Sequence, residues 1–493
     1  MAVSVRRLLV ALFAASVALK LLILAAVKFP QPLVVMDETL YFLQAREIWL
    51  NHSYVLDART FGALYPPLYP LVLSPLTVIA DVNLRYLLGL AVNAFVSSLV
   101  VFPAYGVARF WLDERRSLLL AAVTAFAPLS VAYSFTWMSE NLYVPLFLAA
   151  VYFVLKERRE LAGFTVGLAT LTKVLGLALL PFVVWKFRRK ALLPVLIALL
   201  MASTHFFVCL TETGEPTGYN YSLHSPSSSF ATQLFLAAVY LVCATAPSLL
   251  NLSWQRHKDI IVLVASYTLL VAFASQLPLA HGRYYECLIP VLLIPAFDVF
   301  TKTRTQMAAT AVAAYLFFLL PSLVQPDLVN ASLSLPLSVA RISPLLPLAV
   351  VFPLLLLYVA TRSERLRLSV ACGLVVFILV GSSVVCVASM QKFSYEERNC
   401  CLFQKLKELD AKKGELVFVA DLDEWWANYC LCCFYAQHFI PVGFTKRAKY
   451  AILETCCGCG QKHITRLEPH SDGRLVVREV VPCRCPRCLR GGM

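Results

Sequence analysis

The sequence predicts an all-α membrane domain with many transmembrane segments, followed by a small cysteine-rich α/β domain. Of the 493 residues, 59% are hydrophobic and only 15% are charged, whereas soluble proteins carry about 25% charged residues. Apolar stretches of about 20 residues, the length that crosses a bilayer, recur from Leu8 to Met390. Beyond that point charged residues, cysteine and glycine take over. We therefore predict about 11–13 transmembrane segments in residues 1–390 and a separate soluble domain in residues 391–493.

Positive charges mark the predicted cytoplasmic side of the membrane domain. The net charge of +14 does not indicate a nucleic-acid partner, because the basic residues lie in short clusters between apolar segments, where they act as topology signals. Arg6 and Arg7 favour a cytoplasmic N-terminus. Basic loops then follow at residues 109–117, 156–160, 186–190, 251–259, 301–306 and 362–367. The intervening loops carry few lysines or arginines, so they and the C-terminal domain are expected on the extracytoplasmic side of the cell membrane.

Two apolar segments do not fit as single spans. Residues 66–80 are short and proline-rich, and we expect a juxtamembrane or re-entrant segment there, because irregular backbone at membrane depth must be covered by protein. Residues 161–185 lie between two basic loops that both face the cytoplasm, so the chain must leave and return within them. Two half-length helices that meet at Thr172 and Lys173 satisfy this condition.

An acidic pair follows the first predicted span. Pro30 and Pro32 end that helix, and Asp37 and Glu38 stand at the membrane face, at the start of an amphipathic helix. A carboxylate in this place can take the proton of an acceptor hydroxyl as a general base. Alternatively, Asp37 and Thr39 merely cap the helix that follows. The spacing alone leaves both interpretations open.

Four ordered segments resemble one group of membrane enzymes. They are MDETLYFLQAREIW, YPPLYPLVLSP, MSENLYVPLFLAAVYFVL and AGFTVGLATLTKVLGLALLP. Together they resemble the GT-C superfamily of glycosyltransferases, in particular the branch with protein O-mannosyltransferases and the lipid A aminoarabinose transferase. The likeness covers residues 1–190 well and the later spans only by pattern. It implies a GT-C fold, an active site on the outer face, and a catalytic base at Asp37 with Glu38 beside it.

Five further residues are candidates for substrate binding. Lys173 lies in an apolar hairpin, where a lysine is costly and a functional candidate, and a lipid phosphate is a fitting partner. His281, Arg283 and Tyr284 begin a later span, and arginine suits phosphate recognition. Glu140 begins a span on the outer side, where it is expected to bind the sugar or the acceptor. The alternatives are a snorkelling lysine, an interfacial arginine–tyrosine belt and a helix cap at Glu140.

The resemblance implies an inverting transfer of a hexosyl or pentosyl group from a polyprenyl or dolichyl phosphate to a glycan, lipid or protein. The aminoarabinose transferase branch has a lysine just before the Pro-Pro of the first external loop, where this chain has Tyr65, so the phosphate contact falls to Lys173 and Arg283. An oligosaccharyltransferase-like enzyme is one alternative, and a lipid or sugar transporter or flippase is another. The chain shows no internal repeat, which argues against a transporter.

Eleven of the 16 cysteines lie between residues 400 and 488. Cys456 with Cys459, and Cys485 with Cys488, have the CxxC spacing of zinc ligands. In an extracytoplasmic domain, however, disulfides are the common state of cysteine. Structural zinc and disulfides therefore both stay open, and neither is assigned a catalytic role. For the transfer itself no cofactor is implied with certainty, and a requirement for a divalent cation is left open.

Overall fold

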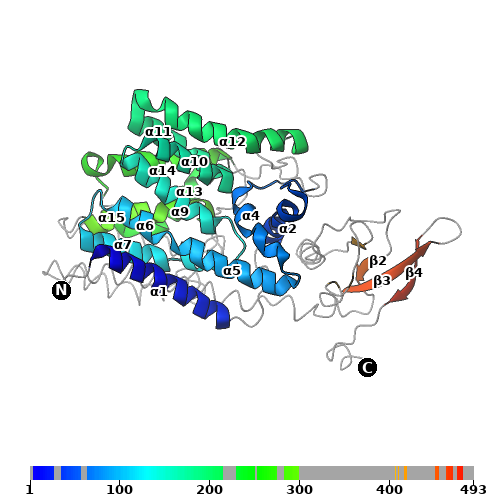
Figure 1. Ribbon diagram of the computed structural model, residues 1–493. Coiled ribbons are helices and arrows are strands. Elements are labelled where there is room, and N and C mark those ends of the chain that lie inside the picture. Colours follow the sequence, from blue (N-terminus) through cyan, green and yellow to red (C-terminus); the bar gives the residue numbers. More distant parts are fainter. Residues whose placement is uncertain are drawn as a thin grey trace. The chain divides into compact units, whose positions relative to one another are not determined.

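A computed structural model gives the structure of the chain (Figure 1). It describes residues 4–26, 35–56, 64–214, 229–249, 252–274 and 282–298, and in the C-terminal part residues 406, 409, 416–418, 450–454, 462–469 and 475–480. The chain divides into two compact units. Unit 1 comprises Met1–Val27, Ala63–Tyr69 and Leu90–Met390, and unit 2 comprises Lys28–Gly62, Pro70–Gly89 and Gln391–Met493.

The described part of unit 1 is built of helices. They are α1 (Val5–Ala26), α6 (Val101–Ala108), α7 (Glu114–Phe126), α8 (Pro128–Val131), α9 (Glu140–Leu155), α10 (Arg159–Thr172), α11 (Leu180–Phe187), α12 (Leu192–Thr213), α13 (Phe230–Leu249), α14 (Trp254–Ala274) and α15 (Ile289–Asp298). Short 3-10 turns join some of them, namely η2 (Tyr133–Phe135), η3 (Val174–Leu179), η4 (Arg188–Lys190), η6 (Gly282–Tyr284) and η7 (Glu286–Leu288). Helix α5 (Val82–Ser98) begins in unit 2 and ends in unit 1.

Several of these helices are apolar enough to cross a bilayer. Within the described residues three segments have the required length and composition, Val5–Ala25, Val82–Ala108 and Leu192–Glu212. Helices in Glu114–Phe126 and Leu129–Phe135 are bent by 57° and make a fourth span if they are counted together. The predicted helical membrane domain is thus confirmed, while the spans expected between residues 307 and 390 lie outside the described residues.

Both irregular segments expected from the sequence have half-length helices. In residues 66–80 the chain forms α4 (Leu68–Leu73) and η1 (Ser74–Val78), which together are too short to cross a bilayer. In residues 161–185 helix α10 ends at Thr172, η3 follows, and α11 begins at Leu180. The structure thus has a break at Lys173, the position predicted from the sequence.

Glycines allow α10 to pack closely against α12. A Cβ on Gly163 would lie 2.6 Å from the carbonyl oxygen of Pro194, and one on Gly167 would meet the side chain of Met201. Small residues let helix backbones approach in this way inside membranes. Helix α9 packs on the same α10 and buries Tyr143, Phe147 and other apolar side chains in the core of unit 1. These contacts hold helix α9 against helix α10, whose C-terminal end precedes the break at Lys173.

A buried lysine links three helices of unit 1. Lys20 of α1 is fully buried, and its ammonium donates hydrogen bonds to the hydroxyls of Ser97 (2.9 Å) and Ser98 (3.0 Å) in α5 and of Ser130 (2.7 Å) in α8. Ser16 adds a hydroxyl contact of 2.9 Å to Ser98. The side-chain nitrogen therefore has three oxygen partners, which offset the cost of burying this polar group.

The described part of unit 2 contains helix α2 (Val35–Asn51) and a four-stranded sheet. Residues 38–45 of α2 are all buried, so the amphipathic pattern expected there is absent from the first half of the helix. The strands run in the order β1-β2-β3-β4 and are β1 (Leu416–Phe418), β2 (Tyr450–Glu454), β3 (Lys462–Pro469) and β4 (Leu475–Val480). β1 and β2 are parallel, and the other pairs are antiparallel. The helical part of the expected α/β domain lies outside the described residues, and the boundary between residues 390 and 391 stays a prediction.

Candidate functional site

Lys173 lies at the break between α10 and η3, within unit 1. Its backbone is extended, with φ −155° and ψ 126°. Its N–H still donates to the carbonyl of Ala169 (2.8 Å), and its carbonyl accepts from the N–H of Gly176 (2.8 Å). The turn needs glycine at that position, because a Cβ on Gly176 would lie 2.7 Å from the backbone carbon of Ala169. The close return of η3 along α10 therefore fixes where the lysine side chain begins.

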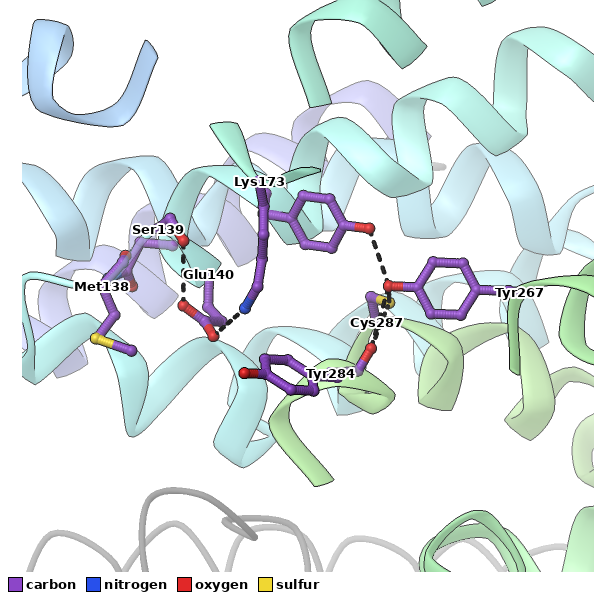
Figure 2. Close-up of polar contacts among 9 residues, drawn as sticks. Met138, Ser139, Glu140, Lys173, Tyr267, Tyr284 and Cys287 are labelled. Carbon is purple, nitrogen blue, oxygen red and sulfur yellow. Dashed lines mark hydrogen bonds and ion pairs between the residues drawn. The ribbon is translucent and has the colours of Figure 1, made fainter. Parts of the chain in front are cut away.

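Glu140 meets Lys173 across 33 positions of sequence. Glu140 is the first residue of α9 and is only 1% exposed. Its carboxylate accepts a hydrogen bond from the Lys173 ammonium and forms an ion pair with it, while Ser139 donates a longer bond of 3.4 Å to its other oxygen (Figure 2). A negative charge in the first turn of a helix is favoured by the helix dipole. Two residues predicted independently from the sequence thus form one pair.

Tyr284 and Arg283 complete this cluster. Both belong to η6. The Lys173 ammonium lies 4.9 Å from the centroid of the Tyr284 ring, and the guanidinium carbon of Arg283 lies 5.3 Å from the same centroid. Positions of this kind are cation–π contacts. The charge of Arg283 also acts on the Glu140 carboxylate. Four of the five predicted substrate-binding residues therefore lie together, and the fifth, His281, lies outside the described residues.

A network of hydroxyl groups holds Tyr284 in place. The hydroxyls of Tyr143 and Tyr267 are 2.9 Å apart, and Tyr267 donates to the carbonyl of Tyr284 at 3.1 Å. The thiol of Cys287 contacts the Tyr267 hydroxyl at 3.4 Å (Figure 2). One signal for this network is visible in the sequence, since Tyr143 lies three positions, about one helical turn, after Glu140. Nothing local marks Tyr267, which comes from α14.

The acidic pair that follows helix α1 lies in unit 2. Helix α2 begins at Val35, so Asp37 and Glu38 occupy its first turn, and Asp37 is not the residue that caps it. Glu38 is 1% exposed, and its carboxylate accepts a hydrogen bond from the hydroxyl of Tyr86 in α5. Asp37 is half-buried. The structure thus separates the two acids, with Glu38 enclosed by protein and Asp37 retaining access to solvent.

The remaining candidates concern metal binding. Cys456, Cys459, Cys485 and Cys488 lie outside the described residues, so zinc and disulfides stay predictions. Among the residues that the structure describes, no group of three or more histidine, cysteine or acidic side chains is arranged to hold a metal ion.

Similar solved structures share this fold. The chain is similar to ArnT from Cupriavidus metallidurans bound to undecaprenyl phosphate, with a TM-score of 0.55 and 16% identity over 87% of this chain and 85% of that one. It is similar to the same protein in the apo state, with a TM-score of 0.56 and 18% identity over 88% and 86%. The Archaeoglobus fulgidus oligosaccharyltransferase tethered with an acceptor peptide gives a TM-score of only 0.43, with 12% identity over 89% of this chain and 64% of that one. No family model and no curated protein sequence matches.

ArnT is a GT-C glycosyltransferase. The similarity to ArnT extends over most of both chains, and the chain accordingly has the helical GT-C membrane fold that its sequence motifs predict.

Proposed function

We propose that this chain is a membrane glycosyltransferase that moves a sugar from a polyprenyl or dolichyl phosphate to an acceptor hydroxyl at the outer face of the membrane. One observation carries the proposal: Lys173, Arg283 and Tyr284 gather around Glu140 at the break of a re-entrant hairpin. Cations at membrane depth mark the pathways and sites of charged substrates. The fold shared with ArnT, a protein whose structure contains undecaprenyl phosphate, supports the same substrate class.

In the proposed reaction the acceptor oxygen attacks the anomeric carbon of the sugar. A new bond forms between that carbon and the acceptor, and the bond from the carbon to the phosphate oxygen breaks with inversion. The phosphate leaves with the bonding electron pair and gains one negative charge. Lys173 and Arg283 stabilise this charge as it develops, which is the way preorganised cations lower such barriers. Asp37 takes the acceptor proton as general base.

The division between Asp37 and Glu38 follows from their surroundings. A general base must be reached by the acceptor, and the half-buried Asp37 meets this condition. Glu38 is buried and already accepts a hydrogen bond from Tyr86. We assign Glu38 the role of anchoring the first turn of α2, so that Asp37 is held in a fixed place beside it.

A comparison of lipid-linked sugars with nucleotide sugars as donors tests this proposal. Membranes that contain the native chain are supplied with labelled polyprenyl-phosphate sugars or with labelled nucleotide sugars, and transferred label is measured. We expect transfer from the lipid-linked donor, with a loss of about 10-fold or more in Lys173→Met, since a charge-assisted contact to the leaving group contributes about 1.5–3 kcal/mol. Lys190→Met is the control, because Lys190 is exposed in η4. Transfer from nucleotide sugars alone, or equal rates in Lys173→Met and the control, would contradict the proposal.

A further inference from the structure

Glu140 is paired with the same Lys173 ammonium that is proposed to bind the phosphate of the sugar donor. The Lys173 side chain is 15% exposed and the Glu140 side chain 2% exposed, and the two form an ion pair. A carboxylate and a phosphate present the same kind of anionic oxygen to an ammonium group. In the site as it stands, the carboxylate is therefore a competitor of the lipid phosphate for Lys173.

The charges of the cluster show what this competition does. Lys173 pairs one to one with Glu140. Arg283 adds a second cation to the cluster, and Glu286, three positions after Arg283, is a second buried acid. A sugar-linked phosphate is a diester with one negative charge. The phosphate monoester released by the transfer carries about −1.5 to −2 at pH 7, by analogy with phosphorylated side chains. A fixed negative charge repels the product about twice as strongly as the donor, because Coulomb energy scales with ligand charge.

We propose that Glu140 is a counter-charge that competes with the lipid phosphate for Lys173 and so favours release of the polyprenyl phosphate product over the bound donor. This inference rests on the proposed function of the same site. It gives Glu140 a role other than contact with sugar or acceptor. It also explains why a buried acid is paired with a cation in a site built for an anion: without it, the product would be the most tightly held ligand. Product release limits the turnover of many enzymes.

The rest of the cluster is arranged to let Lys173 change partners. The ring of Tyr284 lies 4.9 Å from the ammonium, and the ring of Tyr143 lies 6.0 Å from it. Both rings attract a cation without using its hydrogen-bond donors. Lys173 has three such donors, and the structure shows one of them on Glu140. A phosphate therefore meets an ammonium that aromatic faces keep in position while its carboxylate partner is exchanged.

Binding of the phosphate product alone tests the inference. Labelled undecaprenyl phosphate is titrated onto the purified full-length chain in lipid nanodiscs at pH 8. Glu140→Gln keeps the shape of the side chain and an acceptor oxygen but removes the charge, and we expect it to bind the product about 10-fold more tightly than native. Lys173→Met should bind about 10-fold more weakly. The matched control is Glu160→Gln, which removes an exposed acid from the first turn of the next helix, α10, and should bind like native.

A second ligand with a smaller charge shows whether Glu140→Gln changes binding through its charge or through the structure of the site. The methyl diester of undecaprenyl phosphate carries one negative charge, so Glu140→Gln should strengthen its binding clearly less than that of the monoester. If Glu140→Gln binds the monoester as native does or more weakly, while Lys173→Met binds it more weakly, Glu140 only positions the lysine and the inference fails. Equal gains for both ligands also overturn it.

Two binding measurements on the native chain test the inference without a Glu140 variant. The native chain should bind the monoester no more than a few-fold more tightly than the diester, and a preference of 100-fold for the monoester overturns the inference even if Glu140→Gln does not fold. If the native chain binds neither ligand, the proposed function itself fails, and that outcome is distinct from all the others.

Discussion

At the scale of single residues, two lysines of the membrane domain have different kinds of partner. Lys173 has a carboxylate partner and two aromatic rings. Lys20 has three serine hydroxyls instead. The first arrangement leaves the cation partly exposed and open to exchange, whereas the second encloses it completely. We therefore expect Lys173 to matter for binding and Lys20 for stability.

The Lys20 contacts predict that removing a serine acceptor destabilises the chain more than removing the lysine donor does. Removing an acceptor leaves a buried ammonium donor unpaired, which costs about 1–3 kcal/mol. Removing the lysine leaves hydroxyls that still donate elsewhere, Ser98 to the carbonyl of Ala94 (2.7 Å) and Ser130 to that of Ser97 (3.2 Å). Ser130→Ala should lower the apparent melting temperature of the detergent-solubilised chain by several degrees, and Lys20→Met should change it little.

The double variant completes this test. In Lys20→Met with Ser130→Ala, the melting temperature should return close to that of Lys20→Met alone, because coupled residues are not additive. A loss in the double variant equal to the sum of the two single losses would show that Ser130 stabilises the chain independently of Lys20.

At the scale of elements, the hairpin of α10 and η3 positions the site. Helix α10 is fixed on both sides, by α9 and by α12, and η3 returns closely along it. Gly176 makes this return possible, since any Cβ there would collide with the backbone at Thr170 and Ala169. Backbone cannot give way as a flexible side chain can, so the hairpin is expected to tolerate no larger residue at this position.

Substituting Gly176 tests the role of the hairpin. Gly176→Ala should push η3 away from α10 and displace Lys173, with a loss of transfer of about 10- to 100-fold, the range expected for a misplacement of about 1 Å in an active site. Gly167→Ala is the matched control, because its Cβ would meet the flexible side chain of Met201. Rates and melting temperatures of both variants are compared. A Gly176→Ala chain as active as Gly167→Ala would show that the hairpin geometry is not needed.

At the scale of the whole molecule, hydropathy and charge were enough to predict a helical membrane fold. The requirement that residues 161–185 return to the side they left predicted the break at Lys173, and the structure has it there. Long-range pairing was not predictable, since no local pattern shows that Glu140 meets Lys173 or that Tyr267 supports Tyr284. Lys20 was missed although a lysine within an apolar span is a visible signal. The roles assigned to Asp37 and Glu38 rest on the resemblance and remain proposals.

The predicted topology has its own test. A protease site inserted after Glu157, in the short loop between α9 and α10, should be cleaved only by protease on the cytoplasmic side, because residues 156–160 form one of the basic clusters that mark that side. Cleavage is followed in sealed vesicles of known orientation. Cleavage by external protease would reverse the assigned sides of the membrane domain.

Asp37 is the proposed general base of a lipid-linked sugar transfer. Glycosyl transfer from labelled polyprenyl-phosphate sugars, measured in membranes with equal amounts of native chain, Asp37→Asn and Glu47→Gln, tests it most directly. Glu47 lies on the same helix with similar exposure, so its variant controls for the loss of one negative charge. We expect Asp37→Asn to lose about 100-fold or more of the rate, as general bases contribute about 10²–10⁴-fold, and Glu47→Gln to stay near native. Equal transfer by Asp37→Asn and native chains would show that Asp37 is not the general base.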